Sequence, residues 1–267
     1  MKLILRLLNR KNELLCESIS EDRVGLVYKP EYRDGDWIQL CCERSGFYEL
    51  RLEDTLPPTI VYIHSDNPGT FIIPAKGSKR TGYSPRSFHG IQHFIGACAA
   101  NPDLVYARRN LALNPYDTYT ETGIYPHVTT NAVTPHEPMS APRNAIDGLW
   151  LNSGRQPYPY QSWGGRMDPD TRLKLEFGTA VDLDSLVLIL RAAYPHDNFW
   201  KRITVAFSDG SEEVLSTAKS PDPQTFPLTK RGITWLMLKQ LIPSEDSSPH
   251  YALTQIEAWG RVSGKPV

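Results

Sequence analysis

The chain has 267 residues and a formal net charge of −1, with 40% hydrophobic and 22% charged residues. This length suits one large or two ordinary domains, and the composition is that of a soluble globular protein. A net charge near zero gives no electrostatic footprint for nucleic acid, and no block of like charges forms a tail for an anionic membrane. No apolar stretch is long enough to cross a bilayer, so membrane insertion is not expected.

The N-terminal segment 1–16, MKLILRLLNRKNELLC, begins as an apolar run, but Arg6 interrupts it and no small-residue cleavage site follows. We therefore expect a first or edge strand here rather than a signal peptide. The four cysteines lack metal-ligand spacing, and Cys41 and Cys42 on one strand would point to opposite faces. Free thiols and the missing signal predict a cytoplasmic protein, with secretion by a non-classical route as the alternative. The cysteines are Cys16, Cys41, Cys42 and Cys98.

Short apolar or alternating runs bounded by Gly, Pro, Asp and Ser dominate the first part of the chain, which is typical of β-strands. They lie at 36–42, 47–53, 59–64 and 70–75. Only segment 84–114 has helical features, because apolar residues recur there at helical spacing before Asn101 and Pro102 end the pattern. The recurring residues are Phe88, Ile91, Phe94 and Ile95. We predict that residues 1–120 form a β-sandwich domain with a short helical insertion.

Strand-like runs return in the second part of the chain, after a polar and proline-rich stretch that suggests a domain boundary near residue 120. They lie at 173–178, 183–192, 202–215, 232–241 and 253–260. Asp209 and Gly210 form a strong hairpin signal between two of these runs. Short strands at this spacing favour a sandwich or jelly roll. The predicted fold class is therefore all-β, with two β-sandwich (jelly-roll) domains, the second spanning residues 121–267.

Five motifs follow one another in the second domain. They are RNAIDG (143–148), QSWGG (161–165), LKLEFG (173–178), FSDG (207–210) and IEAWG (256–260). In this order they resemble the discoidin, or coagulation factor 5/8 type C, domains, which are galactose-binding-like jelly rolls. The resemblance covers about residues 125–262. Three features depart from the family pattern. Arg172 and Leu173 replace the usual aromatic residue, Glu176 replaces the Asp, and the terminal cysteine pair is missing. The motifs therefore do not identify which ligand the domain binds.

The resemblance implies a non-catalytic binding module that holds a mono- or oligosaccharide in loops at one end of the sandwich. A sugar needs a flat aromatic against its apolar face and charged or amide groups for its hydroxyls. Two loops supply both kinds of residue. The candidate ligand-binding residues are Arg191, Tyr194, His196 and Asn198 from one loop, and Trp150, Arg155, Tyr158 and Tyr160 from the other. Trp200 and Trp163 are expected in the core.

The same resemblance implies a structural calcium ion, since many carbohydrate-binding relatives hold one. Carried over to this sequence, the side chains that would bind it are Asp147 and Glu257, with Ser162 as a helper. Ca²⁺ prefers six to eight oxygen ligands, so backbone carbonyls and water would complete the site. The alternative is that Asp147 caps a turn and Glu257 makes a local salt bridge.

Two other functions stay open at the level of the sequence. The two sandwiches could present their loops to a protein partner or form a homodimer. Alternatively, the chain could be a carbohydrate-active enzyme with a site between the domains. No hydrolase elbow, phosphate loop or dinucleotide fingerprint supports catalysis. The carboxylates of Asp168, Asp170 and Asp197 cannot be paired by sequence alone.

Overall fold

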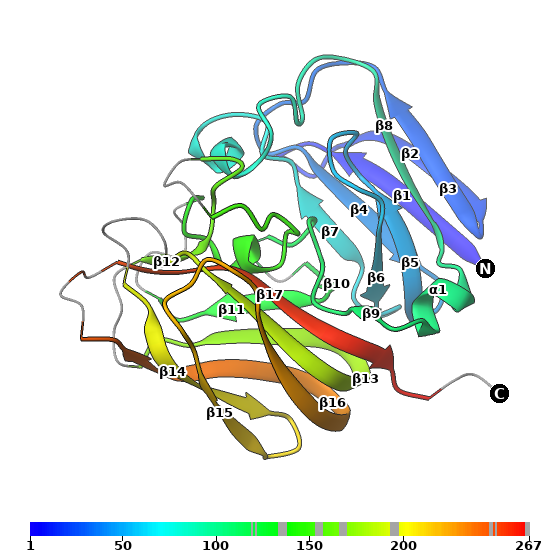
Figure 1. The fold of residues 1–267 in the computed structure, drawn as a ribbon. Helices are drawn as coiled ribbons and strands as arrows, with labels where there is room; N and C mark the ends of the chain where they lie inside the picture. The colour runs from blue at the N-terminus through cyan, green and yellow to red at the C-terminus, as the bar shows by residue number, and fades with distance from the viewer. Residues whose placement is uncertain are drawn as a thin grey trace.

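The computed structural model describes residues 1–118, 120, 122–132, 138–152, 157–165, 170–192, 198–245, 248 and 250–264. Two β-rich bodies lie side by side, with the N-terminal half running from blue to green and the C-terminal half from green to red (Figure 1). Each body has its own cluster of buried apolar side chains. The all-β fold class predicted from the sequence is confirmed. No helix in the described part of the chain is long and apolar enough to span a membrane.

The first N-terminal sheet has the strand order β2-β1-β4-β7. Strand β1 (Lys2–Leu8) alternates between core and surface, and its leucines at positions 3, 5 and 7 are buried. It pairs with β2 and β4 on its two sides, so the N-terminal segment is a first strand but not an edge strand. The other strands are β2 (Leu14–Glu21), β4 (Trp37–Cys42) and β7 (Gly69–Ile72).

The second N-terminal sheet has the order β10-β6-β5-β8-β3 and packs its inner face against the same core. Tyr48 and Leu50 of β5, and Ile95 and Ala97 of β8, point into that core, while their neighbours face outward. The strands are β3 (Arg23–Tyr28), β5 (Gly46–Arg51), β6 (Thr59–Ile63), β8 (His93–Ala99) and β10 (Ile124–Tyr125).

The helix expected from the spacing around residues 88–95 is wrong in its position. Residues 93–99 form strand β8, which pairs with β3 on one side and β5 on the other. Phe88 and Gln92 have φ values of 57° and 65°, which a right-handed helix excludes. The helical segments in the described part of this half are instead η1 (Ser78–Gly82) and α1 (Pro102–Tyr106). Asn101 caps the start of α1 by accepting a hydrogen bond from the Asp103 backbone N–H, so it begins a helix rather than ending one.

The C-terminal sheet has the order β12-β17-β13-β16-β14-β15, and β11 (His127–Thr130) adds to β13. Strands β13 and β16 are long and carry several register shifts, which let the sheet bend around its core. Between β11 and β12 lies the short helix η2 (Pro142–Ala145), which is buried. The strands are β12 (Trp163–Gly165), β13 (Leu173–Leu190), β14 (Trp200–Phe207), β15 (Glu212–Ser216), β16 (Gln224–Pro243) and β17 (Tyr251–Val262).

Strand pairing crosses between the two halves in both directions. Strand β9 (Arg109–Asn110) pairs with β17 of the C-terminal sheet, and Leu111 and Ala112 are buried in the C-terminal core. The chain then returns, because β10 pairs with β6 of the N-terminal sheet. The boundary at residue 120 stays a prediction, and residue 120 lies in sequence between these two paired segments.

The four cysteines are free, as expected. Cys42 is buried on the core face of β4 and Cys41 is half-buried on the other face, so they point apart.

Candidate functional site

Three aromatic side chains packed in a row support the end of the C-terminal sandwich at which β14 and β17 begin. The rings of Trp163 and Trp200 lie 5.8 Å apart, and those of Trp200 and Tyr251 lie 5.9 Å apart at an angle of 13°. Both tryptophans are buried, so the expectation that they belong to the core is confirmed. This stack gives the loops at this end a rigid base.

Arg191 follows the last residue of β13 at this end. Its backbone N–H donates to the carbonyl of Ala252, 3.1 Å away, which fixes the chain as it leaves the sheet. Its Nη1 donates to Oγ of Ser162 at 3.3 Å, and the side chain is half-buried. The guanidinium is therefore held beside the residue that precedes Trp163, with part of its surface open to solvent.

The segment 148–152 presents Trp150 to solvent. Gly148 has φ 84°, and the Leu149 N–H donates to the Asp147 carboxylate, so the segment begins in a tight turn. Asn152 Nδ2 donates to the carbonyls of Leu190 and Pro221 at 3.1 and 2.7 Å. Trp150, between these anchors, is 66% exposed. Because Leu190 directly precedes Arg191, the anchors bring the tryptophan's segment to the same end of the sandwich.

Tyr158 and Tyr160 lie on the segment that leads into Ser162. Tyr158 is exposed and Tyr160 is half-buried, and the Tyr160 N–H donates to the carbonyl of Pro157. The Tyr158 N–H donates to the carbonyl of Thr81, 2.9 Å away, in η1 of the N-terminal half. This contact places Tyr158 on the side of the loop end that faces the other sandwich.

Asn198 is not available to a ligand, and this corrects the sequence-based prediction. It is 1% exposed, and its Nδ2 donates to the carbonyl of Ser248 and to Oη of Tyr251 at 3.0 and 2.9 Å. Its Oδ1 accepts hydrogen bonds from the Phe199 N–H and from Oγ of Ser244. The amide therefore ties the start of β14 to the segment before β17. The candidates Arg155, Tyr194 and His196 lie outside the described residues.

Asp147 is buried among nitrogen donors. Its Oδ1 accepts from the Leu149 N–H and from Nε2 of Gln255, both at 2.8 Å, and its Oδ2 accepts from Nε2 of Gln161 at 3.0 Å. Nη1 of Arg143 lies 4.0 Å from the same carboxylate. Burial raises the pKa of Asp147 to about 6, although Arg143 and the hydrogen bonds act in the opposite direction.

The donor set around Asp147 and Glu257 does not fit a calcium ion. Calcium needs oxygen ligands, but the oxygens of Asp147 already face N–H groups. Oε2 of Glu257 accepts from the indole N–H of Trp259 at 2.7 Å. Among the described residues there is also no group of three or more His, Cys, Asp or Glu that could hold a metal ion. Asp147 holds a turn, as in the alternative, and the local contact of Glu257 is this hydrogen bond to Trp259.

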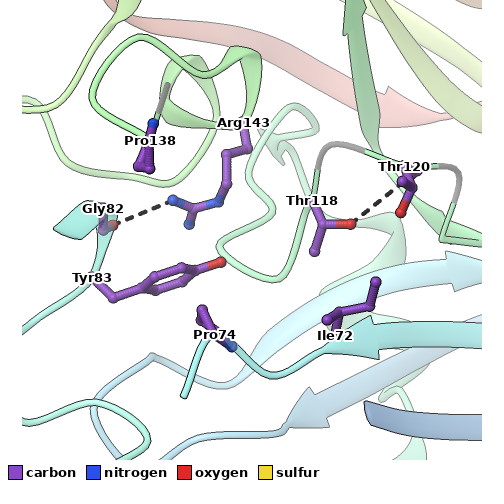
Figure 2. A pocket seen from close by; sticks show the side chains of 8 residues that line it. All are labelled: Ile72, Pro74, Gly82, Tyr83, Thr118, Thr120, Pro138 and Arg143. Atoms are coloured by element: carbon purple, nitrogen blue, oxygen red, sulfur yellow. Dashed lines mark hydrogen bonds between the residues drawn. The ribbon is translucent and has the colours of Figure 1, made fainter. Parts of the chain in front are cut away.

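A small cavity of about 70 Å³ lies between the two halves (Figure 2). Arg143 borders it, and its Cζ lies 4.2 Å from the centre of the Tyr83 ring. The guanidinium donates to the carbonyls of Asp117 and Pro115 at 3.0 Å and to that of Gly82 at 3.3 Å. The described lining residues are Ile72, Pro74, Gly82, Tyr83, Thr118, Thr120, Pro138 and Arg143.

The phenol of Tyr83 and the guanidinium of Arg143 are the titratable groups in the described lining of this cavity. Its described lining carries no carboxylate, imidazole or thiol that could act as a general acid, base or nucleophile. Burial raises the pKa of the Tyr83 phenol, which makes it a weaker acid. Arg143 is instead a structural bridge that the sequence did not reveal, since nothing in RNAIDG shows that its arginine contacts the other half.

No family model matches the chain, and no curated protein matches it. Solved structures do match. A chitosan-binding module from a chitosanase/glucanase of Paenibacillus sp. IK-5 is 17% identical over 57% of this chain and 99% of the module, with a TM-score of 0.39. A fucose-binding module of Streptococcus pneumoniae is 13% identical over 56% of this chain and 96% of the module, with a TM-score of 0.39.

An F5/8 type C domain from Bacteroides fragilis also matches. It is 13% identical over 51% of this chain and 91% of the domain, with a TM-score of 0.39. This is the type of domain that the sequence motifs resemble. Because identities and TM-scores are this low, the function of the chain rests on its own residues.

Proposed function

We propose that the protein is a non-catalytic carbohydrate-binding protein that holds a mono- or oligosaccharide at the loop end of its C-terminal sandwich. The observation that carries the proposal is Trp150. Its indole is 66% exposed, on a segment that Asn152 anchors to the carbonyl preceding Arg191. A large aromatic displayed by a well-anchored segment is typical of a binding loop carried by a rigid scaffold.

The chemistry around Trp150 suits a sugar. An indole offers a flat apolar face to the C–H groups of a pyranose ring. Arg191 offers guanidinium donors to hydroxyl oxygens, and Ser162 helps hold that guanidinium. Tyr158 and Tyr160 supply further aromatic surface from the adjoining segment, with Tyr158 exposed. Arg155, Tyr194 and His196 stay candidate ligand contacts.

Truncation of Trp150 tests this function. A glycan array identifies a bound saccharide, and calorimetry then compares wild type with Trp150→Ala. We expect at least tenfold weaker binding, which corresponds to about 1.4 kcal/mol. Ile91→Ala is the matched control, because Ile91 is equally exposed but lies in the N-terminal half, and it should leave the affinity unchanged. If the wild-type protein binds no saccharide on a broad glycan array, the proposal is wrong.

A protein partner is the second candidate, and one observation favours it. Apolar side chains other than Trp150 are also exposed on the segments that meet at this end, namely Met139, Leu151 and Tyr158. If this surface forms a homodimer, sedimentation velocity will show an increase in mass with concentration, and Trp150→Ala will abolish it. A concentration-independent monomer that binds a saccharide favours the first candidate.

A further inference from the structure

The outer face of the second N-terminal sheet carries a groove that is remote in sequence from the loop end. It crosses strands β3, β8 and β5, has a volume of about 350 Å³ and is open to solvent. The strand register brings its residues together. Arg23 and Glu49 flank Cys98 in one row, and Gly25 and Arg51 flank Gly96 in the next. We call this the β8 groove. Its described lining residues are Arg23, Val24, Glu49, Arg51, Pro58, Phe94, Gly96, Ala97 and Cys98.

The two glycines let an aromatic ring reach across the strands. A Cβ atom at Gly96 would lie 2.9 Å from Cζ of Phe94, and one at Gly25 would lie 3.4 Å from its Cε2. The tip of the Phe94 ring therefore occupies space that a larger residue at Gly25 or Gly96 would take. Phe94 is 40% exposed, and the Cζ atom of Arg51 lies 5.4 Å from the ring centre. The phenyl ring and the guanidinium together form one wall of the groove.

We propose that the β8 groove is a second saccharide-binding site, independent of the loop end, which takes a neutral pyranose against Phe94. The exposed part of the ring meets the C–H face of the sugar. The guanidinium groups of Arg23 and Arg51 donate to hydroxyl oxygens, and the carboxylate of Glu49 accepts from hydroxyl groups.

Charge complementarity selects a neutral ligand over a charged one. An anionic sugar would meet the carboxylate of Glu49, and Asp54 already pairs with Arg51 at 3.0 Å. A cationic sugar would meet Arg23 and Arg51. A polyhydroxyl ligand uses both kinds of group at once, because each hydroxyl is a donor and an acceptor. The volume is also in the lower range of small-molecule sites, ~300–1,000 Å³.

The test uses the full chain in four forms: wild type, Phe94→Ala, Trp150→Ala and the double variant. Saturation-transfer NMR and calorimetry measure binding of neutral gluco-, galacto- and manno-configured oligosaccharides and of matched uronic-acid oligomers. We expect Trp150→Ala to keep one site for a neutral oligosaccharide, and Phe94→Ala to weaken that site at least tenfold. The double variant should lose both sites.

The four forms separate this proposal from the loop-end function. If Trp150→Ala abolishes saccharide binding and Phe94→Ala leaves it unchanged, the proposed groove site is wrong and the loop-end site is supported. If Phe94→Ala abolishes binding and Trp150→Ala leaves it unchanged, the groove site is supported and the loop-end site is wrong. Preference of the Phe94-dependent site for uronic-acid oligomers would also overturn the proposal of a neutral ligand. Ile91→Ala again serves as the control for loss of an exposed apolar side chain.

Cys98 gives a second measurement that does not depend on removing the aromatic ring. It lines the groove and is half-buried, so a bulky maleimide on its thiol should fill the site. Alkylated Trp150→Ala should lose its remaining saccharide binding, whereas alkylated Trp150→Ala carrying Cys98→Ser should retain it. Equal binding by the two alkylated proteins would contradict the proposed groove site.

Discussion

Asp147 shows how one buried side chain couples the fold to pH. Its carboxylate is surrounded by Gln161, Gln255 and the Leu149 N–H, and burial raises its pKa to about 6. An unfolded chain has the ordinary value of about 3.9. The folded state therefore binds this proton more tightly, and the resulting stability is complete below about pH 4 and is lost as the pH rises through 6.

Replacement of Asp147 by Asn should remove this pH dependence. We expect the difference in unfolding free energy, wild type minus Asp147→Asn, to grow by on the order of 2–3 kcal/mol between about pH 7 and about pH 4. Urea unfolding of both proteins at each pH measures it, and other titrating groups cancel in the difference. A difference that does not change with pH would show that Asp147 titrates as it does in the unfolded chain.

At the same scale, the motif residues explain why the fold was easier to predict than the site. Trp163 is buried in the aromatic stack, and Gly148 and Gly210 hold turns at φ 84° and 82°. These residues have structural roles, and their spacing is visible in the sequence. Asn198 looked like a loop amide, but its partners Ser244, Ser248 and Tyr251 are 46 to 53 residues away. No local pattern reveals such contacts.

At the scale of elements, Gly260 allows β17 to lie close to β13. A Cβ atom there would be 2.0 Å from the carbonyl oxygen of Asp182, which is backbone and cannot rotate away. We expect Gly260→Ala to lower the unfolding free energy by about 3 kcal/mol or more, as measured by urea unfolding.

Gly46 at the start of β5 is the matched control for that substitution. A Cβ atom at Gly46 has no neighbour within 4 Å. Gly46→Ala should therefore leave the unfolding free energy unchanged or raise it by up to about 1 kcal/mol. Equal effects at the two glycines would mean that β17 can shift away from β13 at little cost.

Strand β8 shows the limit of reading elements from spacing alone. Phe88, Ile91, Phe94 and Ile95 fit a helical face, yet residues 93–99 are a strand. In the strand, Phe94 and Ile95 lie on opposite faces, and ladders to β3 and β5 on both sides stabilise the extended form. These partners lie far away in sequence, so tertiary pairing overrides the local pattern.

At the scale of the whole molecule, the crossing strands make the C-terminal half depend on residues that precede the predicted boundary. Strand β9 pairs with β17, and Val105, Leu111 and Ala112 belong to the C-terminal core. A fragment of residues 121–267 lacks all of them, whereas one of residues 101–267 keeps them. We expect the shorter fragment to melt at least about 5 °C lower, as measured by differential scanning calorimetry.

The two fragments are matched, because both lack the N-terminal sheets and expose the same contact face. The difference in melting temperature therefore reports on residues 101–120 alone. Equal melting temperatures would support residue 120 as a true domain boundary and would make the pairing of β9 dispensable.

The double crossing also sets an order of events during synthesis. The second N-terminal sheet lacks β10 until residue 125 has been synthesised. By then β9 has been synthesised, but its partner strand β17 has not. Strand β17 follows more than a hundred residues later, on the order of 10 s at ordinary rates of translation. During this interval we expect residues 109–112 to expose their apolar side chains. Until β17 is made, the nascent chain therefore exposes an apolar segment that lacks its partner strand. We expect chaperone binding to this segment to be strongest during that interval.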